Sequence, residues 1–435
     1  MRFIDLTVVV VSLVIGMGIF RTPAEVASKA GTPMIFMAAW IAGAIASSIG
    51  AFIFAEIGSR FPHAGGFYKI FSHCYHPAFA FMVNFITLIS NAASAALVAI
   101  LGAEYLAPII FPGTEKSAAI TLISVFSVLL LYGINMLGIK VSTRFLSVLM
   151  SVKVLFLCMI IGGLFFVEST GQEQMAVVAN SEHNTLTAFM LCFIPVFFTF
   201  GGYQLTINFG GDATKAKSLI PRAIITGMVL VTVIYLLVNY AYMKILGFGA
   251  LQQSSTLAAE VAGVLLGSQI APLVSVIMFL SVLAYVNVSV MSNPRTYYAM
   301  AEDGVMPKAL MKVHPGTHVQ QVALTLFVAI ILTTLFFSGS FQELLKFVMF
   351  FDSIAFMTAA ASIFIFRKRN KNNADEVFRM KGYPWLPIVF ILVYASITLI
   401  TFIQYPQTAF VGFVVFLLCY PLYLIFQKFN RRHES

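Results

Sequence analysis

Twelve long apolar runs follow one another along this chain of 435 residues and leave few alternatives for its fold. A helix needs about 20 apolar residues to cross a bilayer, and each run is of that order. Only 10% of the residues are charged, whereas a soluble domain carries about a quarter. The runs cover approximately residues 4–27, 34–58, 77–107, 117–137, 142–167, 185–209, 219–246, 270–300, 320–338, 342–366, 386–404 and 407–427. We therefore predict an all-α integral membrane protein with twelve transmembrane helices.

The basic residues are distributed unevenly between the loops. If the N-terminus is inside, alternate loops collect Arg60 and Lys69; Lys140 and Arg144; Lys215, Lys217 and Arg222; Arg295, Lys308 and Lys312; Arg367, Lys368, Arg369, Lys371, Arg379 and Lys381; and Lys428, Arg431 and Arg432. The opposite loops hold little beyond Lys29, Lys116 and Lys244, and the loop after the fifth run is acidic. This asymmetry predicts that both termini are cytoplasmic. The net charge of +9 thus indicates topology and not a nucleic-acid partner.

Neither the first run nor the cysteines suggest processing, a metal or a disulfide framework. Only Met1, Arg2 and Phe3 precede the first run, which is long enough to span, so we expect a retained helix and not a cleaved signal. The four cysteines are scattered without metal-ligand spacing. His63, His73 and His76 cluster on one loop, where we expect solvated side chains. We predict no metal and no cofactor.

Two mid-span glycine pairs predict broken helices. In the first run Gly16 and Gly18 stand inside Val14-Ile15-Gly16-Met17-Gly18-Ile19, and in the sixth run Gly201 and Gly202 stand inside Phe198-Thr199-Phe200-Gly201-Gly202-Tyr203. One such pair is equally consistent with close helix packing. Two pairs five spans apart lie in helices of opposite direction, as an inverted five-plus-five repeat requires, with a substrate between them at the bilayer midplane.

Polar residues within the spans are candidates for the binding site. Asn91 in span three and Tyr285 and Asn287 in span eight could shape a pocket or hold helices together. Lys153 lies too deep in span five to reach the interface easily, so it is either a coupling group or a structural cation. Asp352 in span ten could select basic substrates or carry a proton, or it could only pair with Lys346 or hydrogen-bond within a local bend.

Three stretches carry a resemblance to a known family. They are Gly16-x-Gly18-Ile19-Phe20, the stretch from Ala55-Glu56 through Pro62 to Gly65-Gly66 and Tyr68, and the stretch from Arg295 through Tyr298-Ala299-Met300-Ala301 to Asp303-Gly304 and Pro307. The chain to about residue 367 resembles the amino acid-polyamine-organocation transporters. The loop from Asp212 to Ala223 is a plausible fourth match, although the acidic pair of the family is reduced here to Gly211-Asp212.

The resemblance implies a domain plan and a sodium-independent mechanism. Residues 1–168 would form the first five-helix repeat, residues 185–367 the inverted second repeat, and residues 386–428 two additional C-terminal helices. Several sodium-independent members of the family place a lysine in span five where related proteins hold sodium, and Lys153 would take that position, between carbonyls of the broken first span and groups of span eight.

Helix geometry then predicts how an amino acid would bind. Amides of Gly16, Met17, Gly18 and Ile19 would hold its carboxylate, and carbonyls near Val14, Ile15, Phe198 and Phe200 would hold its ammonium. Phe200 and Tyr203 would close over it as an aromatic lid, although Phe200 could equally be a packing residue.

The predicted function is secondary transport of amino acids, with neutral L-amino acids favoured, by exchange or proton coupling across the cell membrane. A cationic amino acid or polyamine permease and a non-transporting amino acid sensor are the alternatives. The spans show no nucleophile with a base at recognisable spacing, which argues against an enzyme. The expected partners are the small-molecule substrate and the lipid bilayer, with the protein a monomer or homodimer.

Overall fold

The computed structural model describes residues 1–16, 18–61, 66–112, 116–166, 184–213, 215–254, 256–337, 341–369 and 377–432. The first half contains α1 (Phe3–Val14), α2 (Gly18–Ala30), α3 (Pro33–Arg60), α4 (Gly66–Cys74), α5 (Pro77–Ile110), α6 (Lys116–Met136), α7 (Ile139–Gly162) and the 3-10 helix η1 (Gly163–Phe165). The second half contains α8 (Thr185–Leu191), α9 (Phe193–Phe200), η2 (Tyr203–Asn208), η3 (Gly210–Asp212), α10 (Ala216–Leu246), α11 (Phe248–Gln253), α12 (Leu257–Leu266), η4 (Ser268–Ile270), α13 (Ala271–Ser292), α14 (Pro294–Glu302), η5 (Lys308–Met311), α15 (Gln321–Phe337), α16 (Phe341–Arg369), α17 (Trp385–Gln404) and α18 (Pro406–Arg432).

The described residues form helices and no strand, and eleven stretches are long and apolar enough to cross a membrane. Each of these stretches corresponds to one of the predicted runs. The remaining run, 320–338, forms α15, whose 17 residues fall just short of that length. The expected class of helical membrane protein is confirmed, whereas the count of twelve crossings stays a prediction.

Local signals explain where several helices begin. The Thr32 side chain accepts a hydrogen bond from the Ile35 amide at 3.3 Å, and Pro33 occupies the first turn of α3. At the start of α8 the Asn184 side chain accepts a bond from the Thr187 amide at 2.9 Å. Both residues satisfy amides that have no partner within the helix, which is the usual role of a helix N-cap.

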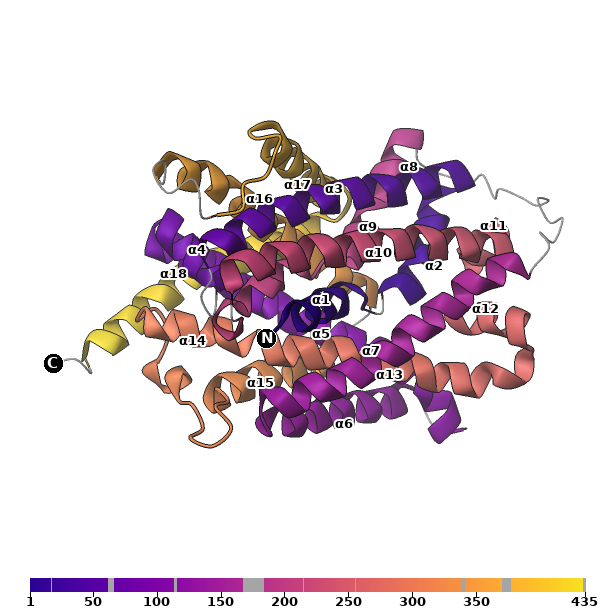
Figure 1. The fold of residues 1–435 in the computed structure, drawn as a ribbon, viewed down its shortest axis with the longest axis horizontal. Helices are drawn as coiled ribbons and strands as arrows, with labels where there is room; N and C mark the ends of the chain where they lie inside the picture. The colour runs from indigo at the N-terminus through magenta and orange to yellow at the C-terminus, as the bar shows by residue number, and fades with distance from the viewer. Residues whose placement is uncertain are drawn as a thin grey trace.

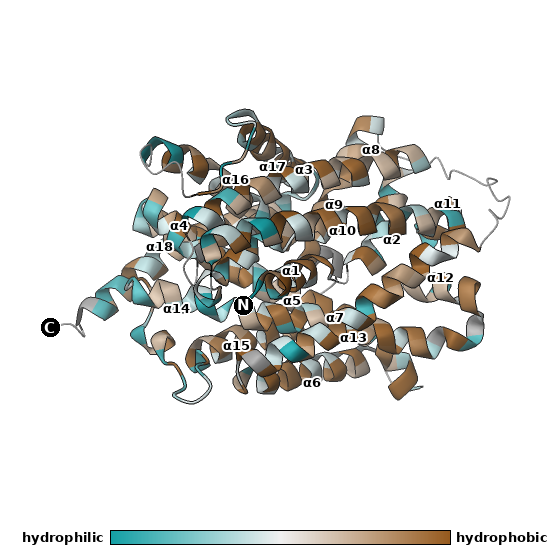
Figure 2. Cartoon of the chain, in the orientation of Figure 1, coloured by the Kyte–Doolittle hydropathy of each residue, from teal (hydrophilic) through white to brown (hydrophobic). Residues whose placement is uncertain are grey.

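The long helices lie side by side along one direction of the molecule, with α3 against α10 and α7 against α13 (Figure 1). In the most apolar window of each span, 83% of the residues on α5 are buried but only 22% of those on α18, so α5 is central and α18 peripheral. Large apolar side chains such as Phe126, Leu155 and Leu418 are exposed on the outer helices. Figure 2 shows hydrophobic residues over much of these helices, as lipid contact requires, whereas the end of α18 near the C-terminus is hydrophilic.

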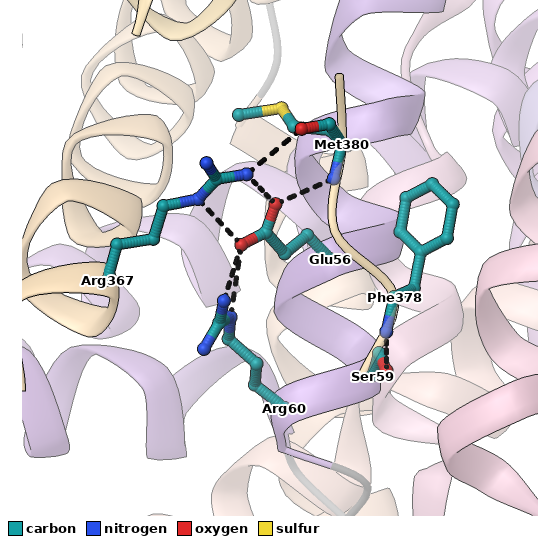
Figure 3. Close-up of polar contacts among 6 residues, drawn as sticks. All are labelled: Glu56, Ser59, Arg60, Arg367, Phe378 and Met380. Atoms are coloured by element: carbon teal, nitrogen blue, oxygen red, sulfur yellow. Dashed lines mark hydrogen bonds and ion pairs between the residues drawn. The ribbon is translucent and has the colours of Figure 1, made fainter. Parts of the chain in front are cut away.

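A buried carboxylate ties three segments together where α3 and α16 end (Figure 3). Glu56 accepts hydrogen bonds from Arg60 at 2.7 Å, from Arg367 at 2.7 Å and from the Met380 amide at 2.9 Å. Beside it, the Phe378 amide donates to the Ser59 hydroxyl at 2.9 Å. The chain before α17 is thereby fixed against α3.

Candidate functional site

The first transmembrane run is broken as its glycines predict. Helix α1 ends at Val14 and α2 begins at Gly18, with Ile15 and Gly16 outside both helices; Met17 lies outside the described residues. Breaking the helix frees backbone groups that need other partners. The Val14 carbonyl accepts a hydrogen bond from the Tyr235 hydroxyl at 2.9 Å, and the Ile15 carbonyl accepts one from the Lys153 ammonium.

The second break lies directly against the first. Helix α9 ends at Phe200, and the chain resumes as the tighter η2 after Gly201 and Gly202. Gly202 has a φ of +112°, and a Cβ there would lie 2.2 Å from the carbonyl oxygen of Leu13. A Cβ on Gly18 would lie 2.8 Å from the Thr199 hydroxyl. Glycine is therefore required at Gly202 both for its backbone conformation and for the contact between the breaks.

A small buried cavity of about 30 Å³ lies between the two breaks. Its lining residues are Leu13, Val14, Gly16, Gly18, Asn91, Ser94, Val98, Phe198, Thr199, Gly201, Gly202, Gln204, Leu205, Tyr285 and Asp352. Ligand pockets usually enclose about 300 Å³ or more. The helices must therefore separate before a molecule as large as an amino acid could occupy this cavity.

Nine of the predicted site residues line the cavity: Val14, Gly16, Gly18, Asn91, Phe198, Gly201, Gly202, Tyr285 and Asp352. Six others lie outside its lining: Ile15, Ile19, Lys153, Phe200, Tyr203 and Asn287. The cavity thus brings together residues from the first, third, sixth, eighth and tenth predicted spans.

The two predicted lid aromatics pack into the protein and away from the cavity. Phe200 is 1% exposed and contacts Trp40 and Tyr235, with ring centroids 6.0 and 5.1 Å apart. Tyr203 is fully buried against Phe54 and Phe356. In this conformation both side chains support the second break instead of covering a ligand.

Asn287 belongs to a separate polar cluster between α6, α7 and α13. Its side-chain oxygen accepts a hydrogen bond from Asn135 at 2.8 Å, and its amide donates to the Ser142 backbone carbonyl and hydroxyl, each at 3.2 Å. These bonds hold Asn287 between neighbouring helices. It joins helices here, which is the second of the two roles expected for such a residue.

Paired side chains form a polar wall opposite the breaks. Asn91 donates to the Asn293 side chain at 2.7 Å, Ser94 and Tyr285 share a hydrogen bond of 2.9 Å, and Ser90 donates to Asp352 at 2.8 Å. Each pair joins α5 to the second half of the chain. The residues of the wall therefore have defined positions.

Three polar lining residues were not among the predicted site residues. They are Ser94, Thr199 and Gln204. Thr199 shares a 2.6 Å hydrogen bond with Thr22, and Gln204 accepts a bond from the Gly202 amide at 2.9 Å. The sequence signal that could have identified them as lining residues is their position: Ser94 lies three residues after Asn91, and Thr199 and Gln204 flank the second glycine pair.

An ion pair joins η3 to α14 beside the N-terminal residue. Arg295 lies 3.0 Å from the carboxylate of Asp212, and the amino group of Met1 donates to the Asp212 carbonyl at 2.5 Å. The family that the sequence resembles has an acidic pair in this loop, and its one remaining carboxylate here, Asp212, is paired with Arg295 on α14.

Among the described residues no group of three or more His, Cys, Asp or Glu side chains could hold a metal.

Membrane-length helices that break in two facing places around a buried cavity define a secondary transporter. The sequence profile described as "Amino acid permease" matches residues 1–426, and the chain belongs to this family. The Bacillus subtilis (strain 168) serine/threonine exchanger SteT is 28% identical over 388 residues, covering 87% of this chain and 86% of that protein. The human "Large neutral amino acids transporter small subunit 2" is 23% identical over 428 residues, with 96% and 78% covered. The human cystine/glutamate transporter is 24% identical over 428 residues, with 98% and 84% covered.

Proposed function

We propose that this protein exchanges neutral L-amino acids across the cell membrane by alternating access, without sodium. The observation that carries the proposal is the meeting of two helix ends of opposite polarity at one cavity. Gly18 begins α2 and Phe198 lies in the last turn of α9, and both line the cavity. An N-terminal helix end favours an anion and a C-terminal end a cation. A zwitterion satisfies both.

The substrate carboxylate would lie on the amides from Gly16 to Ile19 and the ammonium on the carbonyls of Val14, Ile15, Phe198 and Phe200. The Ile15 carbonyl already accepts from Lys153 and has a second lone pair for the ammonium. The Val14 carbonyl accepts from both the Gly16 amide at 2.7 Å and the Tyr235 hydroxyl at 2.9 Å, so Val14 and the Gly16 amide would bind the substrate only after this turn has opened. Lys153 would thus hold the break in place of a sodium ion. Phe200 and Tyr203 would act as a lid only in a conformation in which α9 has moved.

The proposal includes the repeat and topology inferred from the sequence. Residues 1–168 and 185–367 would be two inverted repeats, since the breaks at Gly16 and Gly201 fall in the first long helix of each. Residues 386–428 would be accessory, and both termini would be cytoplasmic. The names of the relatives, which include a serine/threonine exchanger and a transporter of large neutral amino acids, support the neutral substrate class. We propose a monomer or homodimer.

The test is counterflow in proteoliposomes loaded with one unlabelled amino acid and given the same labelled amino acid outside. Serine, threonine, alanine and leucine should exchange, and Gly18→Leu should abolish exchange because its side chain would collide with Thr199. Gly133→Leu is the matched control, since a Cβ there meets no atom within 4 Å. Ligand-induced thermal stabilisation without counterflow would instead indicate a sensor.

A cationic amino acid or polyamine substrate is the second candidate, because the carboxylate of Asp352 lines the cavity. Arginine, lysine and putrescine therefore belong in the same counterflow series. Exchange of these compounds alone would overturn the neutral assignment.

A further inference from the structure

Asp352 is the one acidic side chain among the described residues that line the cavity. It lies within α16, lines the cavity between the helix breaks, and accepts a hydrogen bond from Ser90 on α5 at 2.8 Å. No other aspartate or glutamate is among the described lining residues. A carboxylate at this depth is costly if it is ionised and unpaired, and is a functional group by default.

Two basic side chains within the spans, Lys153 and Lys346, are engaged elsewhere. Lys153 donates to the Ile15 carbonyl. Lys346, two turns before Asp352 on α16, places its ammonium 3.9 Å from the ring centroid of Tyr405. The pairing of Asp352 with Lys346 that the sequence allowed is therefore not formed.

The elements packed against α16 bring tyrosines toward Asp352 and place their charged groups farther along the helix. The facing titratable groups are Tyr285 on α13 and Tyr394 on α17. At the end of α4, Cys74 donates to the Ser362 carbonyl, and Tyr75, the next residue, donates to the Thr358 carbonyl. On α3, Glu56 pairs with Arg367, and on α18, Cys419 and Tyr423 bond within their own helix. Glu104 and Tyr105 lie about four turns beyond Ser90 on α5. Helix α9 (Phe193–Phe200) consists of apolar residues and one threonine, so it carries no titratable side chain.

The hydrogen bonds of Ser90 suit a protonated carboxyl. The Ser90 hydroxyl lies 2.8 Å from Asp352 Oδ1 and 3.3 Å from the Val348 carbonyl, and it has one proton to donate. A protonated Asp352 donates to Ser90, which then donates to Val348, and both contacts become hydrogen bonds. An ionised Asp352 can only accept, so it uses the single hydrogen bond that the Ser90 hydroxyl can donate, and the contact between Ser90 and the Val348 carbonyl is then not a hydrogen bond.

We propose that Asp352 is a proton-binding site that must be filled before a neutral amino acid binds in the cavity. This inference rests on the proposed transport function and adds to it the coupling ion. One proton from solution converts the Asp352 carboxylate to a carboxylic acid. The cavity then holds a neutral acid and a net-neutral zwitterion, so none of the described side chains that line it carries an unpaired charge beside the substrate.

The test measures protons taken up on substrate binding to the purified protein. Calorimetric titration with serine or threonine in buffers of different ionisation enthalpy, between about pH 6 and 8, reports that number directly, because these amino acids do not titrate there. Above the titration midpoint of Asp352 in the substrate-free protein, we expect proton uptake to approach one per substrate and the Kd to rise about tenfold per pH unit. Asp352→Asn should bind with no proton uptake and a nearly constant Kd.

The controls separate this inference from the proposed function. Ser353→Ala changes a buried hydroxyl next in sequence that bonds only to the Met349 carbonyl, and it should behave like the unaltered protein. If Asp352→Asn does not fold, Asp352→Glu should retain proton uptake with a displaced midpoint. Failure of every amino acid to bind overturns the transport proposal. Three results would overturn the role of Asp352. They are binding without proton uptake in the unaltered protein, an unchanged titration midpoint in Asp352→Glu, and proton-independent binding of arginine or lysine.

Discussion

Glu56 accepts a hydrogen bond from Arg367 at 2.7 Å and so joins the end of α3 to the end of α16. The Glu56 side chain is fully buried, and the Arg367 side chain is 20% exposed. The contact lies between α3 and α16, which belong to different repeats in the proposed plan (Figure 3). In the proposed alternating access it would affect the conformational equilibrium as well as folding.

Glu56→Ala should be strongly destabilising, because it leaves the two arginines and the Met380 amide without their acceptor. Removing one partner of a buried ion pair costs about 3–5 kcal/mol. We expect a large fall in the thermal unfolding midpoint of the detergent-solubilised protein. Ser59→Ala is the control, since it removes only the bond from the Phe378 amide, worth about 1 kcal/mol. Equal midpoints for the two variants would show that the carboxylate contributes little.

Gly202→Ala should abolish counterflow. The left-handed φ of +112° is strained for alanine by roughly 1–3 kcal/mol, and its Cβ would collide with the Leu13 carbonyl, so the two breaks would be forced apart. Gly133→Ala, within α6 and facing open space, should keep its activity. Exchange at the unaltered rate in Gly202→Ala would mean that contact between the breaks is not needed for transport.

Lys153→Ala should weaken substrate binding by about 10- to 100-fold. The lysine donates a charged hydrogen bond to the Ile15 carbonyl, and such a bond contributes about 1.5–3 kcal/mol. Without it the first break would lose the group that, in the proposed mechanism, takes the place of a sodium ion. The Kd from calorimetry and the pH profile of counterflow are the measurements. Unchanged transport with an unchanged pH profile would remove the amine from the mechanism.

Asn91→Ala and Asn287→Ala should differ although both asparagines lie in buried parts of the bundle. Asn91 lines the cavity, so its loss should alter the KM and the substrate preference in counterflow. Asn287 lies in the cluster with Asn135 and Ser142, so its loss should lower the unfolding midpoint by an amount corresponding to about 1–3 kcal/mol with little effect on preference. The opposite pattern would contradict the cavity as the binding site.

Several features of this protein follow from local properties of the chain. Hydropathy over about 20 residues depends only on composition, so the membrane class was predictable. The break between Val14 and Gly18 and the turn at Gly201 and Gly202 were also predictable, because two glycine pairs stand in the middle of apolar spans and five spans apart, whereas one pair alone would also have been consistent with helix packing. Six of the nine predicted site residues that line the cavity follow from these breaks, and the other three, Asn91, Tyr285 and Asp352, were predicted as polar residues within apolar spans.

The sides to which individual side chains point were not predictable from the chain alone. Asn91 and Asn287 are both polar residues of apolar helices, yet only Asn91 reaches the cavity, and Phe200 and Tyr203 turn into the packing beside the second break. The partnership of Ser90 with Asp352 joins residues 262 positions apart. Such relationships depend on how each helix is rotated and which helices adjoin it. In a span that is apolar on all sides the sequence carries little periodic signal for that rotation, so it is set by packing between helices.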